Sequence, residues 1–440
     1  GQWVDFERDV QADYQQVFGG LWQPSTLFYA VEQFFDSGGG AAIVVRVANG
    51  ARPCSLDLPA GRHQLRLQAL QPGTREFLRA AVDYDGIGDN EVDRFNLVLQ
   101  RVRAPASEHI EDQEIYRRLS VDPQSSRHVT AALAASQIAR VAGPVPPLRP
   151  DVVRSRVRGG LAGYVLSNPD GDDGGPLTDY DIIGSAAAGT GLFALAAADS
   201  FNFLCVPPPG RDTDLGPSAL LVAHRYCRDR RALLVVDPPA AWQTAADAIA
   251  AMRDWPLARL MARDRLRGRF EAFAPCGAVA GMLTRVAAQR PVWAPPGPDD
   301  ALLRPGLRPL CTVSAAERER LAAAGVNVLQ AVRANGPAVP APRPLAGRGA
   351  TPEQRLLPLR RLSLLVLDSV ERGTRWMLFE PNGPAVWRRA VAQLAAFLGE
   401  LESGGAFAGG GGEPPWFVVC DERINRACER ERGVVNLLFG

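Results

Sequence analysis

The stretch from Arg360 to Gly409 places the strongest constraint on the fold, because its apolar residues follow helix spacing, then strand spacing, then helix spacing again. The apolar positions of the first part share one helix face; they are Leu362, Leu365, Val366 and Val370. The run from Arg375 to Glu380 has the length of a short strand and is followed by turn residues. The next helix presents an apolar face made of Trp387, Val391, Leu394, Leu398 and Leu401. This order predicts half of an α/β layer.

The first third of the chain shows further patterns. Residues 26–35 have the spacing of a helix face, and after three glycines residues 41–47 have the composition of a buried strand. From Arg52 to Arg103 apolar and polar residues alternate between glycine turns, which predicts a small antiparallel β module. The segment 108–140 is predicted to be mostly helical, with an amphipathic helix over 129–141.

The middle of the chain alternates between two kinds of segment. The strand-like runs cover 203–207, 232–237 and 277–283. The helix-like stretches cover 217–229, 240–252 and 314–324. Alternation of this kind predicts parallel strands connected by crossover helices.

Several motifs, taken in order, resemble those of one family. The words "RGTRW" and "FEPN", the helix led by Trp387, and "WFVVCD" from Trp416 resemble the C-terminal core domain of contractile tail sheath proteins. The words "FGG" near Phe18 and "AAIVVRV" from Ala41 are similar to the opening of that core. "YCRDRRALLVVDPP" and "APCGAVAGMLTR" are similar to the family's middle domain. The resemblance covers the chain from about Phe18 to Asn436.

The resemblance implies a multidomain α/β fold. The core is formed by the N- and C-terminal parts of the chain, with a small β-sandwich-like insertion and a subtilisin-like α/β middle domain that lacks a catalytic triad. The implied segments are 1–50 for the N-terminal part of the core, 51–105 for the β-sandwich-like module, 106–178 for a mixed helical connection with loops, 179–345 for the middle domain, and 346–440 for the C-terminal core domain that faces the tube.

The resemblance also implies a structural role and no enzymatic activity. Sheath subunits assemble as stacked hexameric rings around an inner tube, and their contraction drives the tube through a target envelope. The implied partners are neighbouring sheath subunits, the inner tail tube protein, and baseplate and terminator proteins. The implied location is a virion tail or phage-tail-like particle assembled in the bacterial cytoplasm. The alternative role is a baseplate or other accessory component of the same machine.

The resemblance points to one candidate surface. In the family a helix of the C-terminal core domain touches the tube, and by position this is the helix led by Trp387. The expected tube contacts are its outward charges, Arg388, Arg389, Glu400 and Glu402, and the alternative is a solvated helix face. Four tryptophans are the expected anchors of the core or of an interface, namely Trp293, Trp376, Trp387 and Trp416.

Composition argues against several classes of function. The 49 basic and 48 acidic residues nearly balance, and no basic cluster with interleaved aromatic residues occurs, so nucleic acid is not an expected partner. The longest uncharged run, Ile182 to Ala198, is too short and too weakly apolar to span a membrane. No signal peptide is visible either. The seven cysteines form no CxxC pair, which predicts reduced, mostly buried thiols and no zinc or disulfide framework.

No catalytic, cofactor or metal site is predicted. Asp199 and His224 fit the order of a subtilisin triad, but no serine lies between His224 and Ser314, and Ser314 opens a helix with a capping box. The segment 189–194 matches a dinucleotide-binding loop only formally, because no strand precedes it. The acidic loop 168–175 lacks EF-hand spacing. A hydrolase is the enzyme alternative, and labelling by a covalent serine probe would detect it.

The ends of the chain bear on assembly. Tail sheath proteins carry extended arms before the first core helix and after the last core segment, and the arms join neighbours by strand addition. This chain starts at the first core segment and stops at Gly440, shortly after the motif "GVVN" that begins at Gly433. A chain without arms is expected to be impaired in polymerising.

Overall fold

A computed structural model describes the chain in two compact units. The described residues are 3–6, 18, 25–105, 107–152, 163–251, 260–263, 270–297, 299–304, 306–323, 325–332, 336–339, 342–344, 351, 355–407 and 414–440. The first unit comprises Gly1–Val4, Ala12–Gly20 and Val44–Leu195, and the second comprises Asp5–Gln11, Leu21–Ile43 and Ala196–Gly440. The second unit therefore contains both the middle and the C-terminal parts of the chain.

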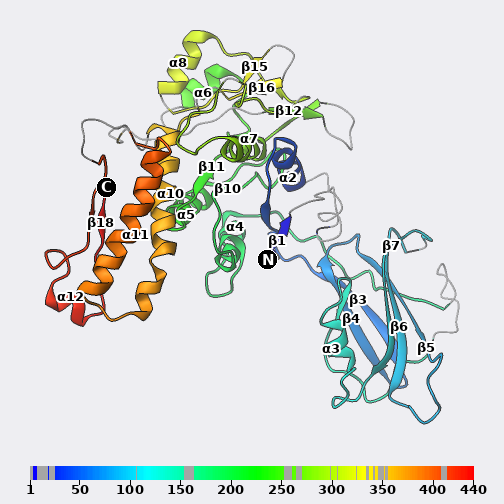
Figure 1. Ribbon diagram of the computed structural model, residues 1–440. Helices are drawn as coiled ribbons and strands as arrows, with labels where there is room; N and C mark the ends of the chain where they lie inside the picture. Colours follow the sequence, from blue (N-terminus) through cyan, green and yellow to red (C-terminus); the bar gives the residue numbers. More distant parts are fainter. Residues whose placement is uncertain are drawn as a thin grey trace. The chain divides into compact units, whose positions relative to one another are not determined.

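The first unit is built on two antiparallel sheets (Figure 1). One sheet has the order β3-β4-β8, with strands Pro53–Ala60, His63–Pro72 and Ala139–Val141. The other has the order β7-β6-β5-β9, with strands Ile110–Ser120, Arg94–Val102, Phe77–Asp83 and Val165–Leu166. Alternate residues of both sheets meet in one core that includes Leu56, Leu67, Leu97 and Leu99. The predicted antiparallel β module is confirmed in strands β3 to β6.

The prediction of a mostly helical segment 108–140 is wrong. Strand β7 pairs along β6, and the residues of β7 alternate between exposed and half-buried up to Arg118. This alternation carries no apolar signal, because the strand is largely charged and lies at the edge of its sheet. The predicted helix over 129–141 is also too long. It consists of the short helix α3, Val129–Leu133, and then β8.

The second unit contains a parallel strand pair with helices packed beside it. Strand β10, Phe203–Cys205, pairs in parallel with β11, Leu233–Val235, and helix α5, Pro217–Asp229, connects them. This confirms the prediction of parallel strands and a crossover helix at these positions. The helix predicted over 26–35 is α2, Leu27–Asp36, and the strand predicted after it is β2, Ala42–Val45.

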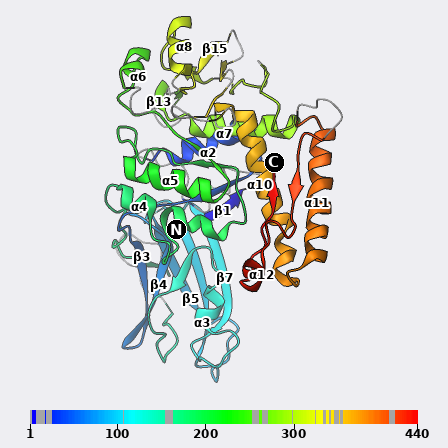
Figure 2. The same cartoon turned by 90° about the vertical axis from the view of Figure 1, so that its left-hand side faces the viewer.

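The strand predicted over 277–283 is wrong, because these residues lie in helix α7, Cys276–Gln289. A short apolar run rich in alanine and glycine does not distinguish a buried strand from a buried helix. Helix α7 lies against α2 in both views (Figures 1 and 2). Gly277 and Gly281, one helical turn apart, face the carbonyl oxygens of Ala30 and Phe34 and leave no room for a side chain. The two glycines thus let the backbones of the two helices approach closely.

The remaining elements are short. The helical ones are α4, Asp179–Ile183; η1, Gly191–Ala197; α6, Ala245–Ala251; and α8, Ala315–Ala323. The strands are β1, Trp3–Phe6; β12, Leu260–Arg263; β13, Phe270–Phe273; β14, Arg308–Pro309; β15, Gln330–Val332; and β16, Gly336–Ala338. In the described part of the chain, no helix is both long and apolar enough to cross a membrane.

The predicted capping box at the start of α8 is present. The Ser314 hydroxyl oxygen accepts a hydrogen bond from the Glu317 N–H over 3.3 Å, and the Glu317 carboxylate accepts one from the Ser314 N–H over 2.8 Å. We expect Ser314→Ala to lower the free energy of unfolding by about 1 kcal/mol, because a helix N–H loses its acceptor. Chemical denaturation measures this change. Ser218→Ala, an exposed serine on α5, is the control, and an equal loss in both variants would contradict the capping role.

The capping box also predicts a pH dependence. The hydrogen bond from the Ser314 hydroxyl, followed by the one from its backbone, lowers the pKa of Glu317 below its usual 4.5. A carboxylate with a lowered pKa in the folded state stabilises the fold above the unfolded pKa, and that contribution is lost as the pH falls through the folded pKa. The difference between wild type and Ser314→Ala should therefore be complete at neutral pH and shrink below pH 4.5. Urea titrations at a series of pH values test this, and a difference that stays constant down to acid pH would refute it.

Candidate interaction surface on the C-terminal helix pair

The C-terminal part of the second unit is a helix pair with a small hairpin. The helices are α10, Leu357–Gly373, and α11, Pro384–Ser403, which lie side by side in Figures 1 and 2. Strand β17, Val418–Val419, pairs in antiparallel fashion with β18, Leu438–Phe439, and the short helix α12, Ala427–Glu431, precedes β18. Proline occupies the first turn of both long helices, where its missing N–H costs no helix hydrogen bond.

The two long helices face each other through their predicted apolar stripes. One cluster contains the buried side chains Leu362, Val366, Val370, Leu394, Leu398 and Leu401. Trp293 and Trp416 pack against this cluster, together with Val418 of β17 and Phe439 of β18. Burial of each such aliphatic side chain contributes roughly 2 kcal/mol. The stripe spacing in the sequence therefore fixes which face of α11 is buried and which is left outside.

The strand predicted from Arg375 to Glu380 is wrong. This segment is the 3-10 helix η2, Arg375–Phe379, and the Met377 N–H donates to the Thr374 carbonyl. Leu378 and Phe379 are 81% and 89% exposed. An apolar run of this length fits a strand only where a neighbouring strand pairs with it, and none does so in the described residues. The connection between the helices is therefore a turn with apolar side chains on its outside.

Trp387 anchors the first turn of α11. Its side chain is 2% exposed, and its indole N–H donates to Asn382 Oδ1 over 2.9 Å. Asn382 Nδ2 donates in turn to the Val434 carbonyl over 2.9 Å, which ties the turn to the segment before β18. Asn382 was not singled out from the sequence. The sequence marks Asn382 as a turn residue, and no local pattern predicts the two partners of its side chain.

Trp376 lies at the same end of the helix pair. Its indole N–H donates to Gln393 Oε1 over 2.8 Å, and Gln393 Nε2 donates to the Gly373 carbonyl over 3.0 Å. The Arg389 guanidinium lies 4.0 Å from the centre of the Trp376 ring and 3.6 Å from Glu380 Oε1. Arg389 is therefore already engaged within the chain by a cation–π contact and an ion pair.

The other end of α11 holds the remaining two tryptophans. The Trp416 indole N–H donates to Glu402 Oε2 over 2.8 Å, and the Trp293 ring lies against Gly404. Glu402 is half-buried and accepts the hydrogen bond from Trp416, so its carboxylate is less available to a partner protein than the helix pattern predicts. Two of the four tryptophans thus lie toward the start of α11 and two toward its end.

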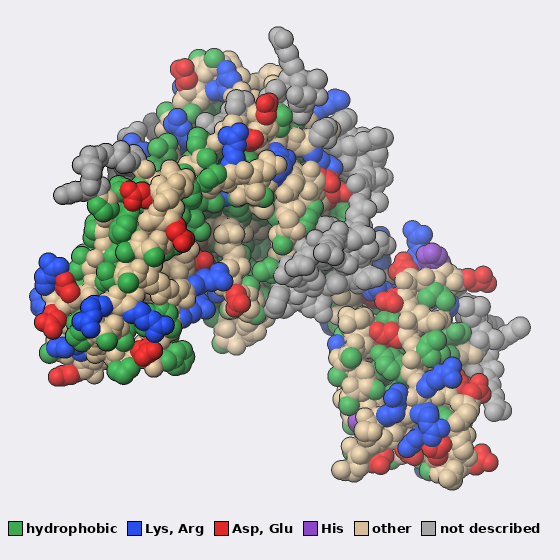
Figure 3. Space-filling model, in the orientation of Figure 1, with side chains coloured by type: hydrophobic (Ala, Val, Ile, Leu, Met, Phe, Trp, Pro, Cys, Tyr) green, Lys and Arg blue, Asp and Glu red, His purple; other side chains and the backbone are tan. Residues whose placement is uncertain are grey.

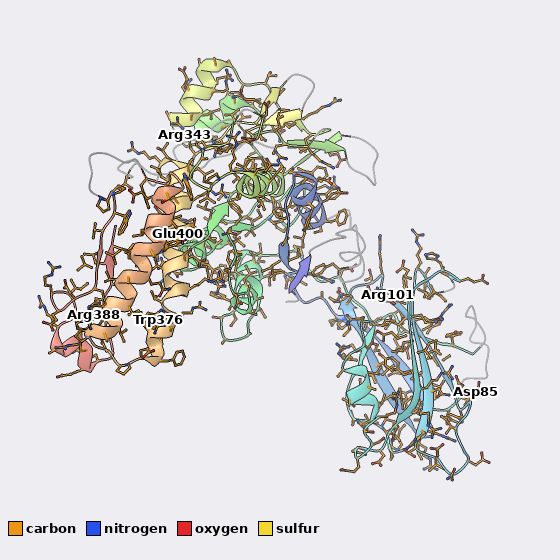
Figure 4. All side chains as sticks on the ribbon, viewed as in Figure 1. Asp85, Arg101, Arg343, Trp376, Arg388 and Glu400 are labelled. Carbon is orange, nitrogen blue, oxygen red and sulfur yellow. The ribbon has the colours of Figure 1, made fainter. Side chains whose placement is uncertain are left out.

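Of the four predicted contact residues, Arg388 and Glu400 are exposed, and their side chains make no hydrogen bond or ion pair with other described residues. Figure 4 shows Arg388 near the α12 end of the helix pair, and Glu400 further along α11. Figure 3 shows arginine side chains gathered at the same α12 end. With a rise of 1.5 Å per residue the two positions are about 18 Å apart along the axis. Glu400 lies in the last turn of α11, where a negative charge opposes the helix dipole, so helix stability does not explain its placement.

The side chains considered for catalysis are not brought together in the described residues. The Ser314 hydroxyl is engaged with Glu317, and His224 lies exposed on α5. At Asp199 the backbone carbonyl accepts a hydrogen bond from Arg230. The middle part of the chain therefore presents no assembled triad within the described residues.

The acidic loop 168–175 is hydrogen-bonded to strand β3 and to the turn that follows β4. The Asp170 carboxylate accepts the Ser55 N–H over 2.8 Å, and the Asp173 carboxylate accepts the Thr74 N–H over 3.0 Å. Asp172 accepts the Gly174 N–H over 2.9 Å. Across the described ranges, no group of three metal-ligating side chains is placed to hold an ion.

Comparisons with known proteins identify the fold. No protein-family model and no curated protein matches the chain. The sheath tail protein of Listeria innocua is similar at 13% identity and a TM-score of 0.61, over 100% of this chain and 91% of that one. The sheath tail protein of Desulfitobacterium hafniense is similar at 14% identity and a TM-score of 0.51, over 95% of this chain and 86% of that one.

A further match is the PVC sheath complex of an extracellular contractile injection system in its contracted state, with 21% identity, a TM-score of 0.47, and coverage of 56% of this chain and 68% of that one. The two sheath tail proteins match over nearly the full length of both chains, at identities of 13% and 14%. The resemblance found in the sequence is confirmed at the level of the fold: this chain has the fold of a contractile tail sheath protein.

Proposed function

We propose that this chain is a structural subunit of a contractile tail sheath. Copies assemble as stacked hexameric rings around an inner tube, and a rearrangement of contacts between subunits shortens the cylinder and drives the tube through a target envelope. The work comes from the difference in contact energy between an extended and a contracted lattice. The partners are neighbouring copies, the tail tube protein, and baseplate and terminator components, in a phage tail or phage-tail-like particle assembled in the bacterial cytoplasm.

The observation that carries this proposal is the extent of the fold similarity. The match covers 100% of this chain and 91% of a sheath tail protein, so the similarity is not confined to one part of the fold. The engagement of Ser314 in a helix cap supports a structural role over a hydrolase. The proposal includes a subtilisin-like α/β fold without a catalytic triad for the middle domain, residues 179–345.

We assign the tube contact to the outer face of α11. Arg388 and Glu400 are the primary contacts, because both are exposed and lie about 18 Å apart on the same helix. Arg389 contributes after release from Glu380, and Glu402 acts mainly through Trp416. Charges at an interface select the partner and its register more than they add affinity. The four tryptophans hold the helix in place and act as anchors of the core.

The experiment that tests the proposal is negative-stain microscopy of the full-length protein expressed alone. A sheath subunit should form regular hollow cylinders, because the contracted lattice has the lower free energy and needs no tube. Monodisperse monomers, with the terminal segments confirmed by mass, would overturn the sheath assignment. That result would favour a baseplate or other accessory component of the same machine.

A further inference from the structure

Three cysteines from three elements converge beside the parallel strand pair. Cys205 ends β10, Cys227 lies in the last turn of α5, and Cys276 is the first residue of α7. The Cys205 thiol donates to the Cys276 carbonyl over 3.5 Å, and the thiols of Cys205 and Cys276 are within hydrogen-bonding reach of each other. These two sulfur atoms are therefore neighbours although the residues are 71 positions apart.

The surroundings hold this thiol pair in place. The Cys276 N–H donates to Asp237 Oδ1 over 2.8 Å, and the next residue, Gly277, packs against the backbone of α2. Cys276 is fully buried and Cys227 is 2% exposed, whereas Cys205 is half-buried. Cys205 is thus the member of the group that a reagent in solution reaches.

The same surroundings disfavour the thiolate forms of the two buried cysteines, Cys276 and Cys227. The hydrogen bond to Cys205 and then burial raise the pKa of Cys276, and burial raises the pKa of Cys227 to about 12. A protonated thiol is a poor nucleophile. In a reducing cytoplasm the group is therefore stable as free thiols during folding and assembly.

We propose that Cys205 and Cys276 form a modification site, at which an internal disulfide closes once the protein meets a thiol oxidant. The class of oxidant is a small disulfide such as glutathione disulfide. The Cys205 sulfur attacks it, forms a mixed disulfide and releases one glutathione thiol. The Cys276 sulfur then attacks Cys205 and gives its proton to the departing glutathione, which forms the protein disulfide and releases the second glutathione. Because the pKa of Cys276 is raised, we expect this second step to be the slower one. The protein loses two electrons and two protons, and glutathione disulfide is reduced to two molecules of glutathione.

The setting for this reaction rests on the proposed function. A particle assembled in the cytoplasm and released from the cell moves from a reducing to an oxidising medium. The bridge would then join β10 to the start of α7 across a long loop, which lowers the entropy of the unfolded chain. Oxidation would stabilise the middle part of the subunit only after release.

The test treats the folded full-length chain with glutathione disulfide, followed by intact mass measurement and peptide mapping. We expect a loss of the mass of two hydrogen atoms, a mapped Cys205–Cys276 bridge, and a rise in unfolding temperature of about 5 °C or more that dithiothreitol reverses. Cys205→Ser and Cys276→Ser should both abolish the bridge. Cys227→Ser is the matched control and should keep it.

Three outcomes would overturn the inference: an unchanged mass, a bridge that maps to Cys227, or a glutathione adduct on Cys205 that never resolves. Should Cys276→Ser fail to fold, Cys276→Ala and the Cys205 variant carry the same comparison. The measurement needs only the unassembled chain. Its failure is therefore distinct from failure of the sheath assignment, which depends on cylinder formation.

Discussion

Gly281→Ala should lower the free energy of unfolding by about 3 kcal/mol or more. A methyl group at this position would lie 2.1 Å from the Phe34 carbonyl oxygen. The obstacle is the backbone of α2, so no side-chain rotation relieves the clash, and α2 must move away from α7. The loss exceeds the gain of up to about 1 kcal/mol that alanine brings to a helix interior. Thermal and urea unfolding of the full-length protein measure the change.

Gly399→Ala is the matched control for this prediction. Gly399 lies inside α11, where the nearest atom to an added methyl group is in the Trp416 ring at 4.0 Å. The same substitution should therefore stabilise the protein by about 0.5–1 kcal/mol, through helix propensity alone. If both variants changed stability in the same direction, the close approach of α2 and α7 would not be the reason for Gly281.

Arg388→Glu should reduce assembly of the sheath on purified tail tubes tenfold or more, while cylinders still form without tubes. Reversing an interface charge places like charges together, which costs several kcal/mol, and 1.4 kcal/mol already corresponds to tenfold. Glu400→Arg should act in the same direction at the other end of α11. The measurement is the fraction of tubes that carry a sheath in negative-stain images, with co-sedimentation as a second readout.

Arg225→Glu is the control for the charge reversals, because Arg225 is also an exposed arginine and lies on α5. It should leave tube decoration unchanged. Equal loss with Arg225→Glu would point to a general effect of net charge. Normal decoration with both Arg388→Glu and Glu400→Arg would remove α11 from the tube contact, while the sheath assignment itself would still depend on cylinder formation.

Much of the fold follows from residue spacing. Helices α5, α10 and α11 carry apolar residues at helical intervals over many turns, and strands β3 to β6 alternate cleanly with one face in the core. In these segments one side is buried, so apolar residues recur in the sequence at the helix or strand interval.

The segments that were predicted wrongly have no such period. Strand β7 is largely charged and lies at an exposed sheet edge, so its apolar residues follow neither the helix interval nor the strand interval. Helix α7 is buried through small residues, and the reason for its glycines is the carbonyl groups of α2, more than 240 positions away. Segment η2 is apolar yet exposed. Only tertiary contacts decide these cases.

On the candidate surface, too, one part can be predicted from residue spacing and another part depends on tertiary contacts. That α11 has an outward charged side follows from its spacing, and the structure leaves Arg388 and Glu400 exposed there, about 120° apart around the helix axis. The hydrogen bond from Trp416 to Glu402, and the stacking of Arg389 on Trp376, join residues whose pairing no local pattern specifies. The sequence therefore predicts which helix to examine, and side-chain contacts decide which of its charges are free.

The placement of the tryptophans has a mechanical consequence. Indole hydrogen bonds tie both ends of α11 to neighbouring segments, through Asn382 at its start and Trp416 at its end. We therefore expect the helix to move as a stiff rod held at its two ends. A stiff rod keeps the spacing of the charges on it constant under load. A push applied along α11 would therefore shift Arg388 and Glu400 together, and their contacts would break and reform as one step.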